Sequence, residues 1–508
     1  MTSLLPDDEH NRALIRNVRP PGWVNPEPKP SYNLVVIGAG TAGLVTAAVA
    51  AALGATVALI EKQLLGGDCL NVGCVPSKGM IRAARAWAAL GRFDEFGIKL
   101  PAGVQHDFGA AMARMRRLRA RISPNDSAQR FTQLGVDVFF GKGRFVDHRT
   151  IEVDGKRLRF AKAAICTGAR AAAPPIPGLK EAGYLTNETV FSLTGLPPRL
   201  AVIGAGPIGC ELAQAFARFG SRVTLLEQAA QILPREDRDA AAIVQARMER
   251  DGVRIALNAA IARVNVMGKD KVVCYSVNGT IEELAVDEIL VGVGRAPNVE
   301  GLGLEAAGVA YDPRAGVEVN DRLQTTNPRI YAAGDICSPY KFTHAADAQA
   351  QIIIQNALFP HPLGLGHASM SRLIIPWCTY TSPEISHVGL YERDAAAQGI
   401  DVETYTYRLS EVDRAILDGE EEGFARLHVR KGTDRIIGAT IVAEHAGELI
   451  SHLVLAMQAG LGLKAITSSI FPYPTQAEVI KKAATAWRKT TLTEGKKQLL
   501  ARWFKWTR

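Results

Sequence analysis

The chain has 508 residues, of which 47% are hydrophobic and 22% are charged. This length is too great for one hydrophobic core and indicates about three or four domains. The seven cysteines are too few for a disulfide scaffold and fit a reducing compartment. The net charge of +8 equals the charge of residues 481–508 alone, so it marks a basic tail and excludes a basic nucleic-acid-binding domain.

Residues 1–30 are predicted to form an N-terminal extension. They contain the acidic residues Asp7, Asp8 and Glu9 and a proline-rich stretch, PPGWVNPEPKP. Because no apolar segment follows a basic start, the sequence predicts no signal peptide and a cytoplasmic location.

The segment 34–60 contains no charged residue and is long enough to resemble a membrane span. Its glycines instead favour a strand over 34–40, a helix over 41–54 and a strand over 56–61. We therefore expect a β-α-β unit at this position.

The turn of this unit carries a dinucleotide-binding fingerprint. Gly38, Gly40 and Gly43 form G-x-G-x-x-G, and Glu61 follows 18 residues after the third glycine. The first glycine allows a tight turn, the second lets the backbone approach a pyrophosphate, and the third lets the helix pack on the strand. The Glu61 carboxylate can accept hydrogen bonds from a ribose.

The same pattern appears a second time with the same spacing. Gly204, Gly206 and Gly209 follow a predicted strand, and Glu227 lies 18 residues after the third glycine. Two copies indicate two dinucleotide sites and electron transfer between two cofactors. The acidic Glu227 favours NADH, whereas nearby arginines leave NADPH as an alternative.

Between the two fingerprints, residues 66–78 read GGDCLNVGCVPSK and place Cys69 and Cys74 five positions apart. The following residues, 76–90, are predicted to be helical, so the helix dipole and Lys78 would lower the pKa of the Cys74 thiol. These features favour a redox-active pair. A zinc site and two unpaired core thiols are the alternatives, although no second ligand pair of zinc-site spacing is present.

This segment resembles the redox-active signature of the flavin-dependent pyridine nucleotide–disulfide oxidoreductases, which include dihydrolipoamide dehydrogenase, glutathione reductase and mercuric reductase. Three further motifs resemble the family in the same order. They are Cys166-Thr-Gly168, VGVGRAPN at 291–298, and Ile330-Tyr-Ala-Ala-Gly-Asp335. The resemblance extends from about residue 31 to about residue 482.

The resemblance implies an α/β fold with two Rossmann-like dinucleotide-binding domains, for FAD and NAD(P), and a C-terminal α+β interface domain. It also implies a homodimer whose active site is shared across the interface. The expected domains are an N-terminal extension (1–30), an FAD-binding domain (31–180 and 300–367), an NAD(P)-binding domain (181–299), an interface domain (368–482) and a basic aromatic tail (483–508).

The resemblance also assigns roles to single residues. It implies that NADH reduces FAD, that electrons then reach the disulfide at Cys74, and that Cys69 meets the acceptor. Glu211 would pair with Lys78 near the flavin, where a lysine stabilises the anionic reduced ring. The implied cofactor-binding residues are Gly38, Gly40, Gly43, Glu61, Lys78, Gly168, Asp335, Gly204, Gly206, Gly209, Glu227 and Gly294.

The chain departs from the family at residues 471–478, FPYPTQAE. Disulfide-reducing members carry His-x-His-Pro-Thr-x-x-Glu here, and Tyr473 stands in place of the acid–base histidine. A tyrosine with a pKa near 10 is a poor base at neutral pH, so Tyr473 is expected to donate a hydrogen bond or to pack. Together with Glu478 it would act opposite the partner's cysteine pair.

Tyrosine at this position resembles the mercuric reductase branch. That enzyme ends in a vicinal cysteine pair, however, and no cysteine follows Cys378 in this sequence, so we expect inefficient Hg(II) reduction. The acceptor stays open among a disulfide, a metal ion and a quinone. Two alternative functions are a dihydrolipoyl dehydrogenase, which Tyr473 argues against, and a membrane-associated redox-sensing flavoprotein.

The last residues, 487–508, interleave Lys and Arg with Trp, Phe and Leu. Such a pattern predicts either a helix that weakly contacts a membrane surface or a solvated helix on the dimer domain. No nucleic-acid-binding motif accompanies it.

Overall fold

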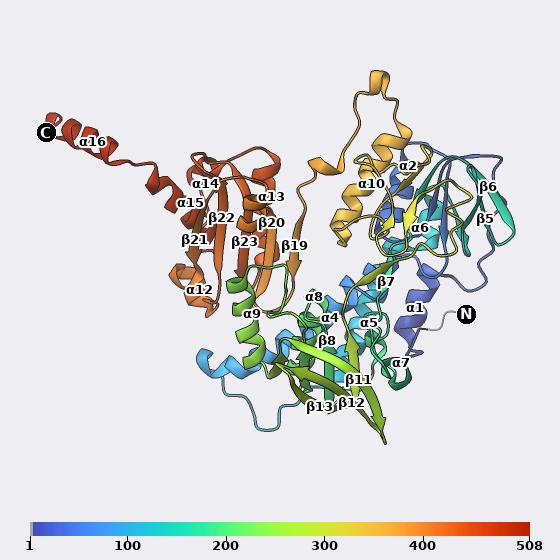
Figure 1. Ribbon diagram of the computed structural model, residues 1–508, viewed down its shortest axis with the longest axis horizontal. Coiled ribbons are helices and arrows are strands. Elements are labelled where there is room, and N and C mark those ends of the chain that lie inside the picture. The colour runs from blue at the N-terminus through green and yellow to red at the C-terminus, as the bar shows by residue number, and fades with distance from the viewer. Residues whose placement is uncertain (1–3) are drawn as a thin grey trace. The chain divides into compact units, whose positions relative to one another are not determined.

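The computed structural model describes residues 4–508, which form two compact units, both seen in Figure 1. Unit one comprises residues 4–228 and 252–373, and unit two comprises residues 229–251 and 374–508. Helices and strands are mixed in both units, which confirms the predicted α/β fold class.

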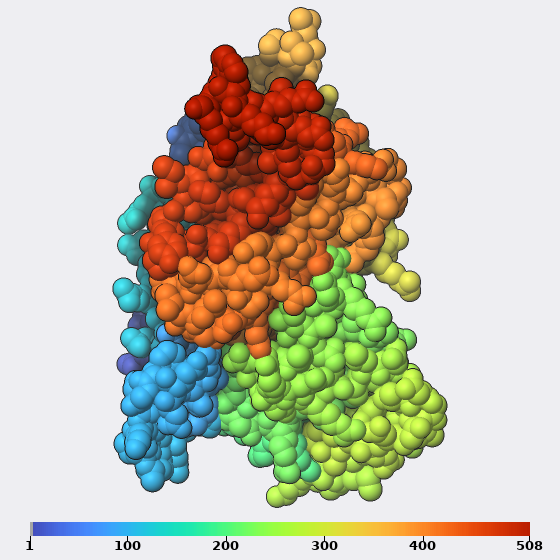
Figure 2. Space-filling model, turned by 90° about the vertical axis from the view of Figure 1, so that its left-hand side faces the viewer, coloured from blue at the N-terminus to red at the C-terminus, as the bar shows by residue number. Residues whose placement is uncertain are grey.

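Unit two is built on a five-stranded antiparallel sheet covered by helices. Its strands, in the order in which they pair, are β19 (Pro376–Thr379), β20 (Glu384–Gly389), β23 (Ile436–Ala443), β22 (Phe424–Arg430) and β21 (Val402–Arg408). Its helices are α9 (Arg238–Arg250), α11 (Glu392–Ala397), α12 (Asp413–Asp418), α13 (Ala446–Gln458), α14 (Leu463–Ser468), α15 (Glu478–Thr490) and α16 (Glu494–Trp506). The C-terminal segment, in dark red, lies at the surface in Figure 2.

The grouping of residues 229–251 with unit two separates α9 from the rest of the expected NAD(P)-binding domain. Buried polar contacts hold this segment in unit two, because Glu236 accepts hydrogen bonds from Trp377 Nε1 at 2.9 Å and from the Tyr391 hydroxyl. The domain limits given above stay a prediction.

Unit one contains a seven-stranded sheet with a parallel centre. Strands β1 and β2 are parallel neighbours, with Leu34 opposite Val57, because continuous apolar runs suit strands buried on both faces. The strands are β3 (Val136–Phe140), β2 (Val57–Glu61), β1 (Tyr32–Ile37), β6 (Lys156–Ile165), β5 (Thr150–Val153) and β4 (Arg144–Asp147) in pairing order, with β18 (Ile330–Ala332) also beside β6.

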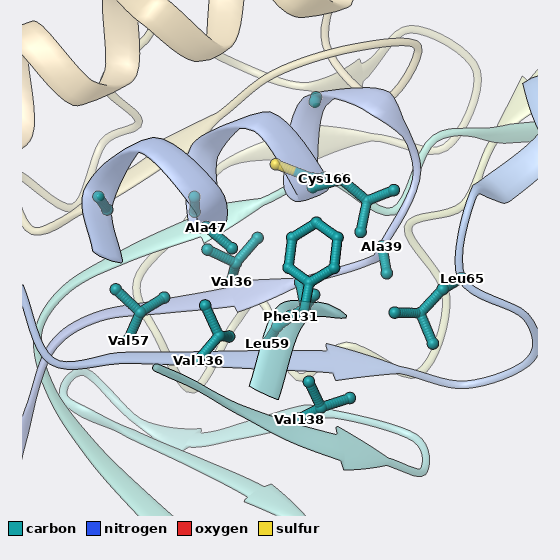
Figure 3. Packing of buried hydrophobic residues seen from close by; sticks show 14 of the residues in the cluster. Val36, Ala39, Ala47, Val57, Leu59, Leu65, Phe131, Val136, Val138 and Cys166 are labelled. Carbon is teal, nitrogen blue, oxygen red and sulfur yellow. The ribbon is translucent and has the colours of Figure 1, made fainter. Parts of the chain in front are cut away.

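The uncharged run 34–60 folds as β1, α2 (Thr41–Ala52) and β2, as its glycines predict. Figure 3 shows Val36 and Leu59 packed with Ala47 of α2 between the sheet and this helix. Among residues 4–508, no helix has the length and apolar character needed to cross a membrane.

A second, four-stranded parallel sheet follows in unit one and repeats the β-α-β pattern. Its strands are β10 (Val253–Ala256), β9 (Arg222–Leu226), β8 (Arg199–Ile203) and β14 (Glu288–Val291), with α8 (Pro207–Arg218) between β8 and β9. The remaining strands of the unit form a three-stranded sheet of β11 (Ala259–Met267), β12 (Asp270–Val277) and β13 (Thr280–Val286), and the pairs β7 (Ala169–Ala171) with β15 (Arg295–Pro297) and β16 (Tyr311–Asp312) with β17 (Gly316–Val317).

The segment with the two cysteines is helical and lies among other helices of unit one. Helix α4 contacts α5 and α8, and α5 also contacts α1. These helices are α1 (Glu9–Val18), α3 (Gly67–Asn71), α4 (Cys74–Ala89), α5 (Phe108–Ile122), α6 (Ala128–Gln133), α7 (Leu179–Ala182) and α10 (Thr343–Leu358).

Candidate active site

The first fingerprint turn shows why each of its glycines is needed. Gly38 has φ +101°, and a Cβ there would lie 2.3 Å from the Cys166 carbonyl oxygen. A Cβ on Gly43 would lie 1.8 Å from the Gly38 carbonyl oxygen. Gly40 differs, because its φ of −79° suits any residue and the nearest described atom to its Cβ position is 3.8 Å away. A group outside the chain, such as a pyrophosphate, therefore explains this glycine best.

The second turn repeats this geometry. Gly204 has φ +97°, and a Cβ on Gly209 would lie 1.9 Å from the Gly204 carbonyl oxygen. Around the Cβ position of Gly206, no described atom outside its own neighbours lies within 4 Å, and its φ is −71°. Both turns therefore leave room at the second glycine, which fits a bound dinucleotide.

The acid at the end of the second strand is fixed in the same way in both copies. Glu61 accepts the Ala39 N–H at 2.8 Å, and Glu227 accepts the Ala205 N–H at 2.6 Å. Burial raises the pKa of Glu61, although the Ala39 and Gln63 N–H groups oppose that rise. Each carboxylate thus stands beside its glycine turn, where a ribose of a dinucleotide would lie.

The two cysteines lie on consecutive helices, the short α3 and the longer α4. Cys69 is in α3 and is half-buried, whereas Cys74 is the first residue of α4 and is exposed. The chain turns between them at Gly73, whose added Cβ would lie 2.8 Å from the Asp68 carbonyl oxygen. The two side chains are not joined by a disulfide in this structure.

The two thiols have opposite acidities. A hydrogen bond from Cys69 lowers the pKa of Cys74 to about 6, and contributions from Thr343 and Lys78 act in the same direction. The same hydrogen bond and burial raise the pKa of Cys69. The opposite directions of these pKa shifts indicate that Cys74 is the residue that carries the charge when the pair loses its first proton.

Lys78 of the same helix and two side chains from distant parts of unit one, Glu211 and Thr343, lie near Cys74. Lys78 Nζ lies 2.8 Å from Glu211 Oε2, so the predicted pair is brought together one helical turn after Cys74. Thr343 Oγ1, at the start of α10, lies 3.5 Å from Cys74 Sγ. No motif marks Thr343, which is 269 residues from Cys74 in the sequence.

Arg295 connects the cysteine loop to the predicted flavin-binding aspartate. Its Nε lies 3.1 Å from Asp335 Oδ2, and its Nη2 contacts Asp68, the neighbour of Cys69. Burial raises the pKa of Asp335, and the Arg295 charge opposes this rise. Arg295 and Asp68 were not predicted as site residues. Both lie inside motifs noted in the sequence, and their opposite charges were the signal that could have indicated an ion pair.

The remaining predicted glycines lie where β7 pairs with β15. The Gly168 carbonyl accepts the Asn298 N–H at 3.0 Å, and the Gly294 carbonyl accepts the Ala172 N–H at 3.0 Å. The CTG and VGVGRAPN motifs therefore meet side by side in unit one.

Tyr473 and Glu478 belong to unit two, where they lie in and beside an exposed turn. Tyr473 is 71% exposed, and its hydroxyl donates to Asp413 Oδ2 at 2.9 Å. This hydrogen bond and the Asp413 charge raise the pKa of Tyr473, so the phenol keeps its proton at neutral pH. Glu478 is the first residue of α15.

The alternative of a zinc site has no ligand set in the described chain. Within residues 4–508, no group of three or more His, Cys, Asp or Glu side chains is arranged to hold a metal ion.

The acidity of Cys74 predicts a pH-dependent reactivity. With a pKa of about 6, the thiolate forms as the pH rises through 6, whereas an ordinary cysteine needs a pH near 8.5. Iodoacetamide alkylation of Cys74 in the reduced protein, located by fragment-ion mass spectrometry, should therefore be near its maximal rate at pH 7.5. An apparent pKa at or above 8.5 would contradict this assignment.

Two dinucleotide turns in one unit, with a reactive dithiol beside the first, define an oxidoreductase that works through a thiol pair. The comparisons with known proteins agree with this class. The family model described as "Pyridine nucleotide-disulphide oxidoreductase" matches residues 32–351, and the model of that family's dimerisation domain matches residues 375–484. The chain belongs to this family, whose members are FAD-dependent and take electrons from NAD(P)H.

Individual relatives cover most of the chain. It is 36% identical to a mercuric reductase of Staphylococcus aureus, over 90% of this chain and 83% of that protein. It is 34% identical to a dihydrolipoyl dehydrogenase of Geobacillus stearothermophilus, over 89% and 95%. The Cu(II) complex of the HOCl-induced flavoprotein disulfide reductase RclA from Escherichia coli matches with a TM-score of 0.78 and 30% identity, over 88% and 98%.

Proposed function

We propose that this oxidoreductase passes electrons from NADH, through FAD and the Cys74/Cys69 pair, to a metal-ion, disulfide or quinone-type acceptor. The observation that carries the proposal is the position of Cys74 at the start of α4, near Thr343 and the Lys78–Glu211 pair, a setting that lowers the pKa of its thiol. A reactive cysteine needs such a setting of donors and positive charge.

The residues present fit FAD at the first fingerprint. Gly40 and Glu61 would hold its pyrophosphate and ribose, and Asp335 its ribityl and phosphate side. When bound, FAD supplies the hydride acceptance that links a nicotinamide to a dithiol. Lys78, held by Glu211, would place a positive charge beside the flavin.

The dithiol would then deliver two electrons to the acceptor. With a disulfide acceptor, Cys69 attacks one sulfur after its proton passes to the Cys74 thiolate, and one acceptor thiolate leaves. Cys74 then gives up its proton and attacks Cys69, so that the second acceptor sulfur leaves and the Cys69–Cys74 disulfide forms. The acceptor gains two electrons and one proton from the cysteine pair, and its second thiolate takes a proton from solvent.

Tyr473 favours a metal ion or quinone over lipoamide as the electron acceptor. A dithiol–disulfide exchange with a lipoyl group is assisted by an acid–base residue near neutral pKa, and the Asp413 contact keeps the Tyr473 pKa above its usual value. We propose that Tyr473 and Glu478 line the acceptor site opposite the partner's cysteine pair in a homodimer, which the family's dimerisation domain supports.

An acceptor screen tests this proposal. NADH oxidation by the FAD-loaded protein is measured with each of five acceptors: Cu(II), Hg(II), a quinone, glutathione disulfide and lipoamide. We expect Cys69-dependent turnover with at least one metal ion or quinone and little with lipoamide. Rapid lipoamide turnover would instead identify a dihydrolipoyl dehydrogenase, and equal turnover by Cys69→Ser with every acceptor would refute the dithiol route.

We expect NADH to be preferred over NADPH by about tenfold or more in kcat/KM, because the Glu227 carboxylate would repel a 2′-phosphate. Glu227→Gln keeps the hydrogen bond from Ala205 but removes the charge, so this variant should narrow the preference by improving the use of NADPH. Rates of flavin bleaching with each nucleotide measure both effects. A native preference for NADPH would show that the carboxylate does not select the nucleotide.

A second proposal concerns helix α16, which we infer contacts an anionic membrane surface. Its five large apolar side chains share one side of the helix and are 42–77% exposed, whereas Arg502 and Lys505 lie on the opposite side. A second copy of this basic helix would repel it, so anionic lipid is the better partner. The exposed side chains are Leu499, Leu500, Trp503, Phe504 and Trp506.

Vesicle sedimentation tests this contact in the full-length protein. We expect pelleting with phosphatidylserine-containing vesicles, weaker pelleting with phosphatidylcholine alone, and loss of pelleting in the double variant Trp503→Ser, Phe504→Ser. Removal of residues 491–508 should have the same effect, because the cut spares α15 and its buried Ala483 and Ala484. Full-length protein that stays in solution with every vesicle would refute the contact. The cytoplasmic location stays a prediction.

A further inference from the structure

Two buried arginines of α5 lie between the N-terminal helix α1 and the cysteine loop. Arg116 is 5% exposed and Arg119 is 3% exposed. Both hydrogen-bond to residues at the start of α1, and Arg119 also reaches the loop between Cys69 and Cys74. We propose that α1 positions the dithiol through Arg119, with Asn11 as the positioning residue. This inference rests on the redox role proposed for the two cysteines.

The first part of the connection joins α1 to α5. Asn11 Oδ1 accepts a hydrogen bond from Arg119 Nη2 at 2.7 Å, and Asn11 Nδ2 donates to the Pro6 carbonyl at 2.8 Å. Asp8, the N-cap of α1, accepts from Arg116 Nε and from the Asn11 N–H. Asn11 is 2% exposed, so both ends of its amide are fixed in the interior.

The second part joins α5 to the cysteine loop. Arg119 Nη1 donates to the backbone carbonyl of Asn71, the last residue of α3. A carbonyl at a helix end has no partner within the helix, so this contact supplies one. The Asn71 side chain donates to the carbonyls of Leu65 and Gly67, at 3.0 and 2.8 Å. The loop is therefore held from both sides at a point two residues after Cys69 and three before Cys74.

The contact with Asn11 matters to Arg119 because the guanidinium is buried and both of the acceptors named here are neutral oxygens. Burial, and then the charge of Arg116, lower the pKa of Arg119 to about 10. Removing the acceptor of a buried charged donor costs free energy. The Arg119 guanidinium would therefore move toward another acceptor. Such a shift of Arg119 would release the Asn71 carbonyl.

The loop position in turn sets the acidity of Cys74, because the hydrogen bond from Cys69 is the largest cause of its low pKa. A shift of Asn71 would separate the two thiols and weaken that hydrogen bond. Helix α1 lies before residue 32, where the match to the family model begins, so this support belongs to a part of the chain that the family model does not cover.

The test compares Asn11→Ala with Asn17→Ala in the full-length, FAD-loaded protein. Both residues lie in α1 and make one hydrogen bond to another segment, but Asn11 accepts from Arg119 whereas Asn17 donates to Ser123 Oγ, at 2.8 Å. The readout is the alkylation rate of Cys74 against pH after reduction, with the melting temperature measured beside it. A rise of one pKa unit lowers the thiolate fraction at pH 6 by about fivefold.

We expect a fall of about this size for Asn11→Ala, an unchanged rate for Asn17→Ala, and a smaller fall for Asn11→Asp, which keeps the acceptor for Arg119 but loses the donor to Pro6. An unchanged rate for Asn11→Ala would overturn the inference. If Asn11→Ala does not fold, Arg119→Lys replaces it, because a lysine lacks the planar fork that spans both carbonyls, and the same fall is required. A native protein without a low-pKa Cys74 would refute the proposed function itself, before any variant is compared.

Discussion

Replacing Cys74 with serine should reduce the turnover of every dithiol-dependent acceptor by about 10³-fold or more, as the loss of a nucleophile does in other covalent enzymes. Serine keeps the size of the side chain and its place at the start of α4, but a hydroxyl cannot form the Cys69–Cys74 disulfide. It also cannot supply a thiolate, so the long-wavelength absorbance of a thiolate–flavin pair should disappear. Stopped-flow absorbance and steady-state NADH oxidation measure the two effects.

Cys378→Ser is the matched control for this substitution. Cys378 is half-buried in β19 of unit two, where its sulfur lies 3.7 Å from the Thr379 carbonyl oxygen. We expect native turnover and native absorbance for this variant. If Cys74→Ser keeps the long-wavelength band, the thiolate has been assigned to the wrong sulfur.

Replacing Lys78 with methionine should destabilise the protein and make Cys74 less acidic. Glu211 is 6% exposed and Lys78 is 36% exposed, so removing the lysine takes the positive charge away from a buried carboxylate. Breaking a fully buried pair costs about 3–5 kcal/mol, and the exposure of Lys78 reduces the expected loss to about 1–3 kcal/mol. The pKa of Cys74 should rise because the Lys78 charge is one of the causes that lower it.

Glu211→Gln separates this electrostatic effect from simple loss of stability. It breaks the same ion pair and should also lower the free energy of unfolding, but the Glu211 charge raises the pKa of Cys74. Its removal should therefore make Cys74 more acidic, opposite to Lys78→Met. Urea unfolding and Cys74 alkylation against pH measure the two effects, and shifts of the same sign in both variants would contradict the electrostatic account.

Much of the fold follows from local patterns in the sequence. The two fingerprint turns were predictable because Gly38 and Gly204 need a left-handed backbone and Gly43 needs close packing, which only glycine tolerates. The strand–helix–strand prediction for residues 34–60 is confirmed, and it was possible because the same glycines mark the turn. The grouping of residues 229–251 with the C-terminal unit was not predicted, since it depends on single buried contacts such as that of Glu236 with Trp377.

Some residues of the candidate site could be predicted from the sequence, and others could not. The position of Cys74 at a helix start and its neighbour Lys78 could be read from adjacent residues, and the pairing of Lys78 with Glu211 came from the family resemblance. Thr343 and Arg119 were missed, because each reaches the cysteine loop through the tertiary fold and stands in no recognisable motif. Contacts of this kind depend on how distant helices pack, and a single sequence holds no local signal for them.

The most direct test of the central claim is an anaerobic titration of the oxidised, FAD-loaded protein with NADH, with free thiols counted at each step. We predict uptake of one electron pair by the disulfide and a second by the flavin. The long-wavelength thiolate band should rise during the first step, when two new thiols appear. Bleaching of the flavin by a single equivalent of NADH, with no new thiols and no long-wavelength band, would contradict the proposed route through Cys74 and Cys69.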